Sequence, residues 1–184
     1  MPTDRDNDGR TDLVLFRPST NTWYPRSTAT GPLTPTQFGE LGDKPMVGDF
    51  DADGVGDIAL FRPSNNNWYI IKSSLGFFVQ MWGEAGDIPT TGDFDGDGAT
   101  DQAVFRPSTG QWFLSRTTAG FSSQFWGQNG DIPVAADYDG DGKTDVAVFR
   151  PANATRYIVN STAGIQTTQF GQTGDVPTQS SLLY

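Results

Sequence analysis

The chain alternates short hydrophobic runs with polar stretches rich in glycine and proline, and none of the runs has the spacing of a helix. In the last quarter, apolar runs at Val134–Ala136, Val146–Phe149, Tyr157–Val159 and Ile165–Phe170 are separated by turn residues. Val146–Phe149 is apolar at every position, which is typical of a strand packed on both faces. The pattern therefore predicts a small antiparallel sheet of four short strands in this segment.

The same pattern recurs along the whole chain with a period of about 44 residues, within the range of propeller blades. Phe-Gly or Trp-Gly pairs and Gly-Asp-x-Pro turns mark each copy. One small sheet cannot bury both of its faces, so the copies are expected to stack. We predict an all-β fold: a four-bladed β-propeller of four-stranded antiparallel blades, in a single domain over 1–184. The expected repeats are approximately 1–44, 45–88, 89–132 and 133–176.

The two ends of the chain are complementary. The first copy has only three residues before its acidic loop, whereas residues 175–180 match the opening strand of a fifth copy. We expect residues 176–181 to supply the strand that the first copy lacks and so to close the ring. The same strand given to a neighbouring molecule would produce a dimer, a larger ring or a filament. One extra residue between 32 and 37 predicts a bulge or a looser edge in the first copy.

Each copy carries the motif Asp-x-Asp-x-Asp-Gly-x-x-Asp. Calcium takes about six to eight oxygen ligands, and a loop with carboxylates at positions 1, 3 and 5 supplies several of them. Glycine at position 6 permits the sharp turn, and position 7 contributes only its backbone carbonyl, so its side chain is free to vary. Acid–base catalysis explains neither feature. We predict four structural Ca²⁺ ions, one per repeat. The predicted ligands are Asp4, Asp6, Asp8, Arg10, Asp12, Asp49, Asp51, Asp53, Val55, Asp57, Asp93, Asp95, Asp97, Ala99, Asp101, Asp137, Asp139, Asp141, Lys143 and Asp145.

Charge and composition exclude several classes of function. The formal net charge is −10, but 16 of the 22 acidic residues lie in the four motifs. No basic stripe exists, so we predict no nucleic-acid partner. The chain has neither cysteine nor histidine, which excludes disulfides, thiol nucleophiles and Ser-His-Asp triads. No apolar run approaches about 18 residues, so no membrane span is expected. The opening residues lack a signal-peptide pattern, and we expect a mature or excised fragment.

Two further sets of residues keep the period. An arginine after each apolar strand and an aspartate in each Gly-Asp-x-Pro turn recur with the same period, which favours ion pairs within or between blades over a ring of anion-binding guanidinium groups. Three tryptophans recur in the third strand of the copies, and core packing is favoured over stacking on sugars. Asn153 and Asn160 each begin an N-glycosylation acceptor pattern. The periodic residues are Arg17, Arg62, Arg106 and Arg150; Asp43, Asp87, Asp131 and Asp175; and Trp23, Trp68 and Trp112, with Arg156 in the fourth place.

These residues resemble the FG-GAP, or VCBS-type, repeats. Phe38-Gly39 is followed by the acidic loop at 49–57 and by the strand at 59–63, although Phe-Arg-Pro stands where that family often has Gly-Ala-Pro. Such repeats form the ligand-binding head of integrin α chains, some fungal lectins and many secreted bacterial proteins. The resemblance implies an extracellular, non-enzymatic calcium-binding propeller for adhesion or recognition of a protein or glycan ligand. A carbohydrate-binding lectin and a filament subunit joined by strand donation are the alternatives.

Overall fold

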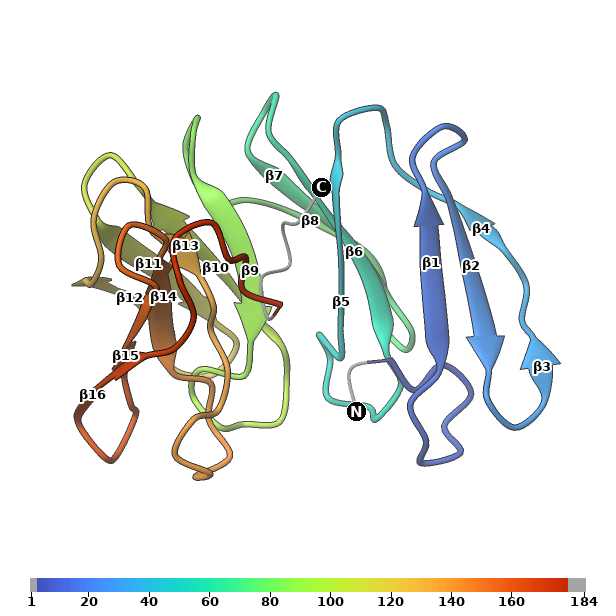
Figure 1. Cartoon of the computed structure of the whole chain (residues 1–184). Coiled ribbons are helices and arrows are strands. Elements are labelled where there is room, and N and C mark those ends of the chain that lie inside the picture. Colours follow the sequence, from blue (N-terminus) through green and yellow to red (C-terminus); the bar gives the residue numbers. More distant parts are fainter. Residues whose placement is uncertain (1–2, 179–184) are drawn as a thin grey trace. The chain divides into compact units, whose positions relative to one another are not determined.

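The computed structural model describes residues 3–178, which form sixteen β-strands and no helix (Figure 1). The strands pair into four sheets, and the register is antiparallel throughout. The predicted all-β fold with four four-stranded antiparallel blades is confirmed. The first sheet holds β1 (Leu13–Arg17), β2 (Thr22–Ser27), β3 (Gly31–Pro32) and β4 (Thr36–Gln37); the second β5 (Lys44–Gly48), β6 (Asp57–Arg62), β7 (Asn67–Lys72) and β8 (Gly76–Met81); the third β9 (Ile88–Gly92), β10 (Asp101–Arg106), β11 (Gln111–Arg116) and β12 (Gly120–Phe125); and the fourth β13 (Ile132–Pro133), β14 (Val146–Arg150), β15 (Thr155–Val159) and β16 (Ile165–Gln169).

The strand that follows each acidic loop is the buried one. In β6, β10 and β14 every residue before the terminal arginine is buried, because these strands are covered on both faces. The last strand of each of these sheets lies at an edge, and β16 is exposed along its whole length. The uninterrupted apolar runs of the sequence thus mark the strands that are buried on both faces.

The first sheet departs from the other three. It begins at β1, where Leu13 and Leu15 are 58% and 69% exposed. Its outer edge is split, because β3 and β4 both pair with β2; Leu33 still donates to the carbonyl of Pro25 at 3.1 Å, but Thr34 and Pro35 leave the ladder. Pro35 lies in this gap and has no N–H group to donate. The looser edge predicted between residues 32 and 37 is confirmed.

The opening strand of the fourth sheet lies earlier than predicted. β13 covers Ile132–Pro133, a position expected to be a turn. The segment Val134–Ala136 adds one backbone hydrogen bond, from Val134 N–H to the carbonyl of Ala147 at 2.9 Å, and an isolated bridge from Ala136 to Asp145. Pro133 is tolerated there because this edge strand needs no N–H from it. At the end of the chain, residues 176–178 form no strand, and residues 179–181 of the expected closing strand lie outside the described residues. Ring closure therefore stays a prediction.

The chain divides into two compact units, one of residues 1–85 with 98–100 and one of 86–97 with 101–184. In the first unit, Trp23 packs with Ile58 and Leu60 of the second sheet. In the second unit, Trp112 of the third sheet packs with Val148 of the fourth. Within each unit, neighbouring sheets therefore share a core, as stacked copies must. The prediction of a single domain over 1–184 remains open. No helix that could span a membrane occurs between residues 3 and 178.

Candidate metal centres

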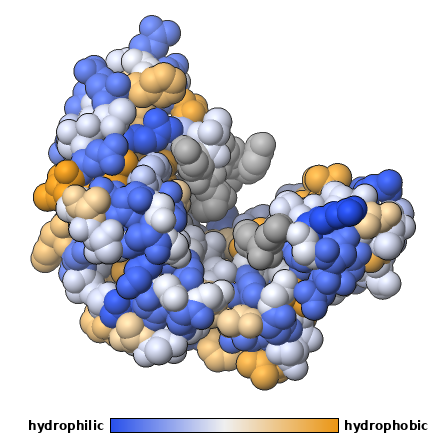
Figure 2. Space-filling model, turned by 90° about the horizontal axis from the view of Figure 1, so that it is seen from below, coloured by the Kyte–Doolittle hydropathy of each residue, from blue (hydrophilic) through white to orange (hydrophobic). Residues whose placement is uncertain are grey.

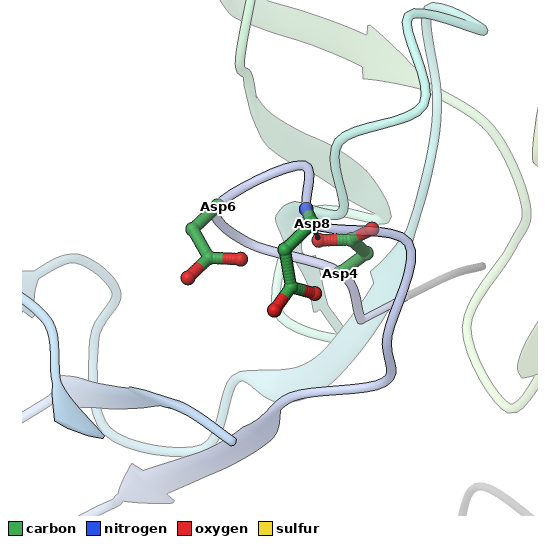
Figure 3. A group of neighbouring side chains, drawn as sticks. All are labelled: Asp4, Asp6 and Asp8. Carbon is green, nitrogen blue, oxygen red and sulfur yellow. Dashed lines mark hydrogen bonds between the residues drawn. The ribbon is translucent and has the colours of Figure 1, made fainter. Parts of the chain in front are cut away.

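Three carboxylates converge in every acidic loop. In the first loop, one oxygen each of Asp4, Asp6 and Asp8 lie within 4.8 Å of one another, and Figure 3 shows the three side chains gathered on one side of the loop. The second loop brings together the same three positions. In the third and fourth loops the converging group contains the carboxylate at position 9 instead of the one at position 5. The other groups are Asp49, Asp51 and Asp53; Asp93, Asp95 and Asp101; and Asp137, Asp139 and Asp145.

The first aspartate shapes the loop. In the second loop, the backbone N–H groups of Asp53 and Gly54 donate to the two oxygens of Asp49, at 3.2 and 2.9 Å. Gly54 has φ +89°, as the sequence required of position 6. Position 4 is left-handed as well, with Ala52 at φ +57°, which the motif did not predict. The chain thus wraps tightly around the first carboxylate by using two left-handed residues.

The aspartate at position 3 of the motif has one side-chain oxygen without a hydrogen-bond donor. Oδ2 of Asp51 accepts a hydrogen bond from the Ser74 hydroxyl at 2.7 Å, whereas its Oδ1 is buried and has no hydrogen-bond partner. The Oδ1 atoms of Asp6 and Asp95 are in the same state. A buried acceptor without a partner costs free energy, and a carboxylate oxygen costs more than a neutral one. Three equivalent orphaned oxygens beside converging carboxylates fit a hard divalent cation.

The aspartate at position 5 of the motif is held ionised by hydrogen bonds. In the second loop, Asp53 accepts from the Ser73 hydroxyl at 2.5 Å and from the backbone N–H of Val55 at 2.8 Å. The Ser73 hydroxyl and then the Val55 N–H lower the pKa of Asp53 below its ordinary value. In the fourth loop, the Ser161 hydroxyl has the same effect on the pKa of Asp141. These carboxylates are therefore negatively charged at neutral pH, as a cation ligand must be.

The aspartate at position 9 of the motif joins the loop to the rest of the blade through hydrogen bonds. In the second loop its two oxygens accept from the backbone N–H groups of Phe50 and Ser73, each at 2.7 Å. Burial raises the pKa of Asp57 to about 6, and the same cause raises the pKa of Asp101 to about 6. Each oxygen keeps a second lone pair, so these hydrogen bonds are compatible with the predicted role as a ligand. A bound cation would favour the ionised form that burial disfavours.

A pair of Ser or Thr residues completes each of the last three centres, and the sequence reasoning missed it. These residues lie in the turn between the third and fourth strands of a blade. Their hydroxyl and N–H groups donate to the carboxylates at positions 3, 5 and 9 of the motif. A dipeptide of this type recurs with the repeat, which is a signal visible in the sequence. The pairs are Ser73-Ser74, Thr117-Thr118 and Ser161-Thr162, and Thr28 binds Asp12 in the first blade.

Neighbouring loops are joined within each unit. In the second unit the N–H of Thr144 donates to the carbonyl oxygen of Asp93 at 2.6 Å. Gly92 makes room for this contact, because a Cβ there would lie 2.5 Å from the Thr144 methyl group. In the first unit the N–H of Gly56 donates to the carbonyl of Asp4. An ion bound in one loop would therefore bear on the position of the adjacent loop.

The periodic arginines form the predicted ion pairs. Nε and NH2 of Arg150 donate to the two oxygens of Asp131 at 2.8 and 2.9 Å, and Arg62 and Arg106 repeat this geometry with the preceding aspartates Asp43 and Asp87. Arg17 instead donates to the hydroxyl of Tyr24 at 2.6 Å. The structural interpretation of these residues is confirmed for three of the four repeats.

The periodic tryptophans belong to the core. Trp23, Trp68 and Trp112 are at most 2% exposed, so they cannot stack on a sugar in solution. Their indole N–H groups donate to backbone carbonyls at 3.0–3.1 Å. Asn160 is also buried, so its glycosylation pattern is not accessible in this fold, whereas Asn153 is exposed.

The family of FG-GAP-like repeats matches residues 4–60 and 93–148, which is more than half of the chain. The chain belongs to this family. The matched segments contain all four acidic loops in full. No curated protein matches the sequence.

Two kinds of solved structure resemble the fold. A catalytically inactive virginiamycin B lyase from Staphylococcus aureus, with quinupristin, superposes with a TM-score of 0.58 at 12% identity. The match covers 91% of this chain and 54% of the lyase, so this chain spans about half of the lyase's length. BBS1N in complex with ARL6DN has a TM-score of 0.46 at 14% identity, over 89% of this chain and 63% of that one. At these identities the similarity to the lyase shows the fold alone.

Proposed function

We propose that the protein is an extracellular, non-enzymatic recognition module whose FG-GAP-like repeats each bind one Ca²⁺ ion. The observation that carries the proposal is the orphaned Oδ1 atom of the third-position aspartate, which is buried beside two further carboxylates in the first three loops. In each loop the carboxylates at positions 1, 3, 5 and 9 and the carbonyl at position 7 would hold the ion. They nearly fill its coordination shell, so the ion would stabilise the fold rather than present a ligand.

The loop chemistry supports Ca²⁺ over Mg²⁺. All side-chain donors are oxygens, and they come from a wrapped loop with two left-handed residues. Mg²⁺ demands a tight octahedron and keeps several of its waters, whereas Ca²⁺ accepts more oxygens in a looser arrangement. Extracellular calcium modules commonly bind at about 10⁻⁴–10⁻³ M, which supports a secreted or cell-surface setting.

A role in recognition is supported by what the scaffold offers. The ions would fix loops and turns at one end of each blade, and a surface held in this way loses little entropy on binding a protein or glycan ligand. The chain has no histidine or cysteine, and within residues 3–178 every carboxylate cluster that could hold a metal lies in the loops. This composition favours binding over catalysis. The lyase similarity concerns only the fold and does not extend its activity to this chain.

Calcium titration by calorimetry, together with thermal melts in calcium and in EDTA, tests the proposal. The wild type should bind about four ions and lose stability in EDTA, since ligand at about 100 times Kd stabilises by about 2.7 kcal/mol per site. Asp51→Asn removes the charge of the carboxylate that carries the orphaned oxygen and should abolish one site. Glu40→Gln removes one charge outside the loops, where the Glu40 side chain is 70% exposed, and should leave all sites intact.

Two results would refute the proposal. An identical melt in calcium and in EDTA would show that the loops hold no structural ion. Equal losses of calcium binding in Asp51→Asn and Glu40→Gln would show that general charge, rather than the loop, attracts the cation.

A further inference from the structure

The outer strand of the second sheet carries an exposed hydrophobic stripe. Within residues 3–178, β8 pairs only with β7, so the backbone groups along its other side point away from the sheet. Its sequence is Gly-Phe-Phe-Val-Gln-Met, without a charged residue or a proline. The β8 stripe consists of the hydrophobic side chains of this strand and of the turn residue before it, which are 39–74% exposed: Leu75, Phe77, Phe78, Val79 and Met81.

The β8 stripe differs from the scattered hydrophobic residues of an ordinary protein surface. On the face drawn in Figure 2, hydrophobic residues form separate small groups among hydrophilic ones, which is common in monomeric proteins. The exposed leucines of β1 have a predicted partner in residues 176–181. No segment of the repeat is expected to cover β8, so the exposure of its stripe calls for a partner outside the chain.

The other copies of the repeat protect the same edge. The residue equivalent to Val79 is Ser123 in the third sheet and Thr167 in the fourth. The first sheet interrupts this edge, with Pro32 in β3 and Pro35 in the gap that follows. Proline, short strands and bulges are common means of preventing an edge from pairing with another chain. β8 has none of them, since it forms six consecutive residue pairs with β7.

Contacts within the first unit hold the aromatic members of the β8 stripe in place. The Phe77 ring stacks on that of Tyr69, with 6.4 Å between the ring centres, and lies perpendicular to the ring of Phe38 at 6.2 Å. The ammonium nitrogen of Lys72 lies 5.1 Å from the centre of the Phe78 ring. Side chains whose positions are already fixed lose little entropy when a partner covers them. The stripe is therefore suited to binding without rearrangement.

We propose that β8 pairs with β8 of a second copy of this chain, antiparallel about a two-fold axis at Val79. An axis perpendicular to the sheet places residues of the same face opposite each other. Val79 would then lie opposite Val79 of the second copy, and Phe77 opposite Met81, so hydrophobic side chains meet hydrophobic ones. No charged residue lies in the strand, so the pairing brings no like charges together within it.

The exposed area is sufficient for a weak dimer. The five side chains of the β8 stripe together expose about 500 Å² on each copy, since a large side chain has about 200 Å². Two copies would bury at most about 1,000 Å² of this surface, which is near the lower limit of a specific interface. The unpaired backbone groups of β8 would add hydrogen bonds, as in other cases of strand addition. A second copy matches the stripe in both length and hydrophobicity.

Substitutions at the centre of the proposed two-fold axis test the pairing. Val79→Lys and Val79→Glu each place two like charges opposite each other in the dimer. Ser123→Lys adds the same charge at the equivalent, exposed position of β12 and is the control. Sedimentation equilibrium at about 1–300 µM would measure association, in about 0.15 M salt to screen the repulsion between chains of net charge −10. Thermal melts would show that each variant is folded.

We expect the wild type and Ser123→Lys to dimerise equally, with a Kd of about 10–100 µM. Val79→Lys and Val79→Glu should each dimerise at least about tenfold more weakly. An equimolar mixture of these two variants should recover the dimer, because lysine then lies opposite glutamate, a result that general surface charge does not produce.

Three results would overturn the proposal: a wild type that stays monomeric over this range, equal dimerisation of Val79→Lys and Ser123→Lys, or a mixture no more dimeric than either variant alone. The β8 stripe contains no carboxylate of the acidic loops, so none of these results bears on the calcium titration. The proposal therefore goes beyond the proposed function and fails or holds independently of it.

Discussion

The ion pair between Arg150 and Asp131 should be one of the strongest polar contributions to stability in the second unit. The Asp131 side chain is fully buried and that of Arg150 is 22% exposed, and two parallel hydrogen bonds join them. The guanidinium also lies 4.3 Å from the centre of the Tyr157 ring. Hydrogen bonding to Asp131 raises the pKa of Arg150, so the guanidinium keeps its charge.

Arg150→Met keeps most of the side-chain volume but removes the charge. Breaking a buried pair costs about 3–5 kcal/mol, because the remaining charge is left buried. Water reaches part of Arg150, so we expect about 2–3 kcal/mol from the pair after this screening. Loss of the contact with the Tyr157 ring adds about 0.5–1 kcal/mol. For a chain of this length the total corresponds to a fall in Tm of about 6–12 °C.

Arg17→Met is the matched control within the same chain. The Arg17 guanidinium lies at the same 4.3 Å from the centre of the Tyr24 ring, but Arg17 is exposed. No carboxylate within residues 3–178 forms an ion pair with it. This substitution should cost only about 1 kcal/mol. Urea denaturation of both variants in calcium measures the difference directly. Equal losses in the two variants, or a loss below about 1 kcal/mol in Arg150→Met, would refute the reasoning.

Three further predictions concern the loops and the chain ends. Ala52→Gly should raise the free energy of unfolding by about 1 kcal/mol, because Ala52 is left-handed at φ +57°; the exposed Ala119→Gly is the control, and a loss of stability at Ala52 would contradict the strain. In EDTA, the free energy of unfolding should fall as pH rises from about 4 through 6, by about 1 kcal/mol for each of Asp57 and Asp101. The reason is that burial raises both pKa values, so the folded state favours the protonated form. Urea denaturation that gives the same free energy across this pH range would contradict the prediction. Closure of the ring by residues 176–181 predicts that a chain without these residues is less stable, because the first sheet would lose its opening strand. Sedimentation of the full and shortened chains would show whether the strand pairs within one chain or between chains, and equal stability of the two chains would exclude closure.

Much of the fold could be predicted because the repeat states the same constraint four times. The run Val146–Phe149 is apolar at every position, and it is buried on both faces as expected. The split edge of the first sheet followed from one extra residue and Pro35. β13 was misplaced, because residue types alone do not tell which residues of Ile132–Ala136 reach the neighbouring strand at bonding distance.

The candidate metal centres were predictable in position but not in detail. The spacing of the aspartates and the glycine at position 6 identified the loops. The sequence did not show that both oxygens of the aspartate at position 9 accept hydrogen bonds from backbone N–H groups. Nor did it show that Ser73 and its counterparts donate to the carboxylate at position 5. These contacts join a loop to a turn about 20 residues away, and a local motif carries no information about such distances.

The sequence by itself determined the repeat, the strand pattern and the four acidic loops, because periodicity and loop chemistry are local properties of the chain. Only the tertiary structure decided which oxygens are left without a donor and which arginine lacks a carboxylate partner. These features depend on side chains from different strands meeting in space. In a repeat protein they appear where one copy departs from the others, and there we expect the specific function to lie.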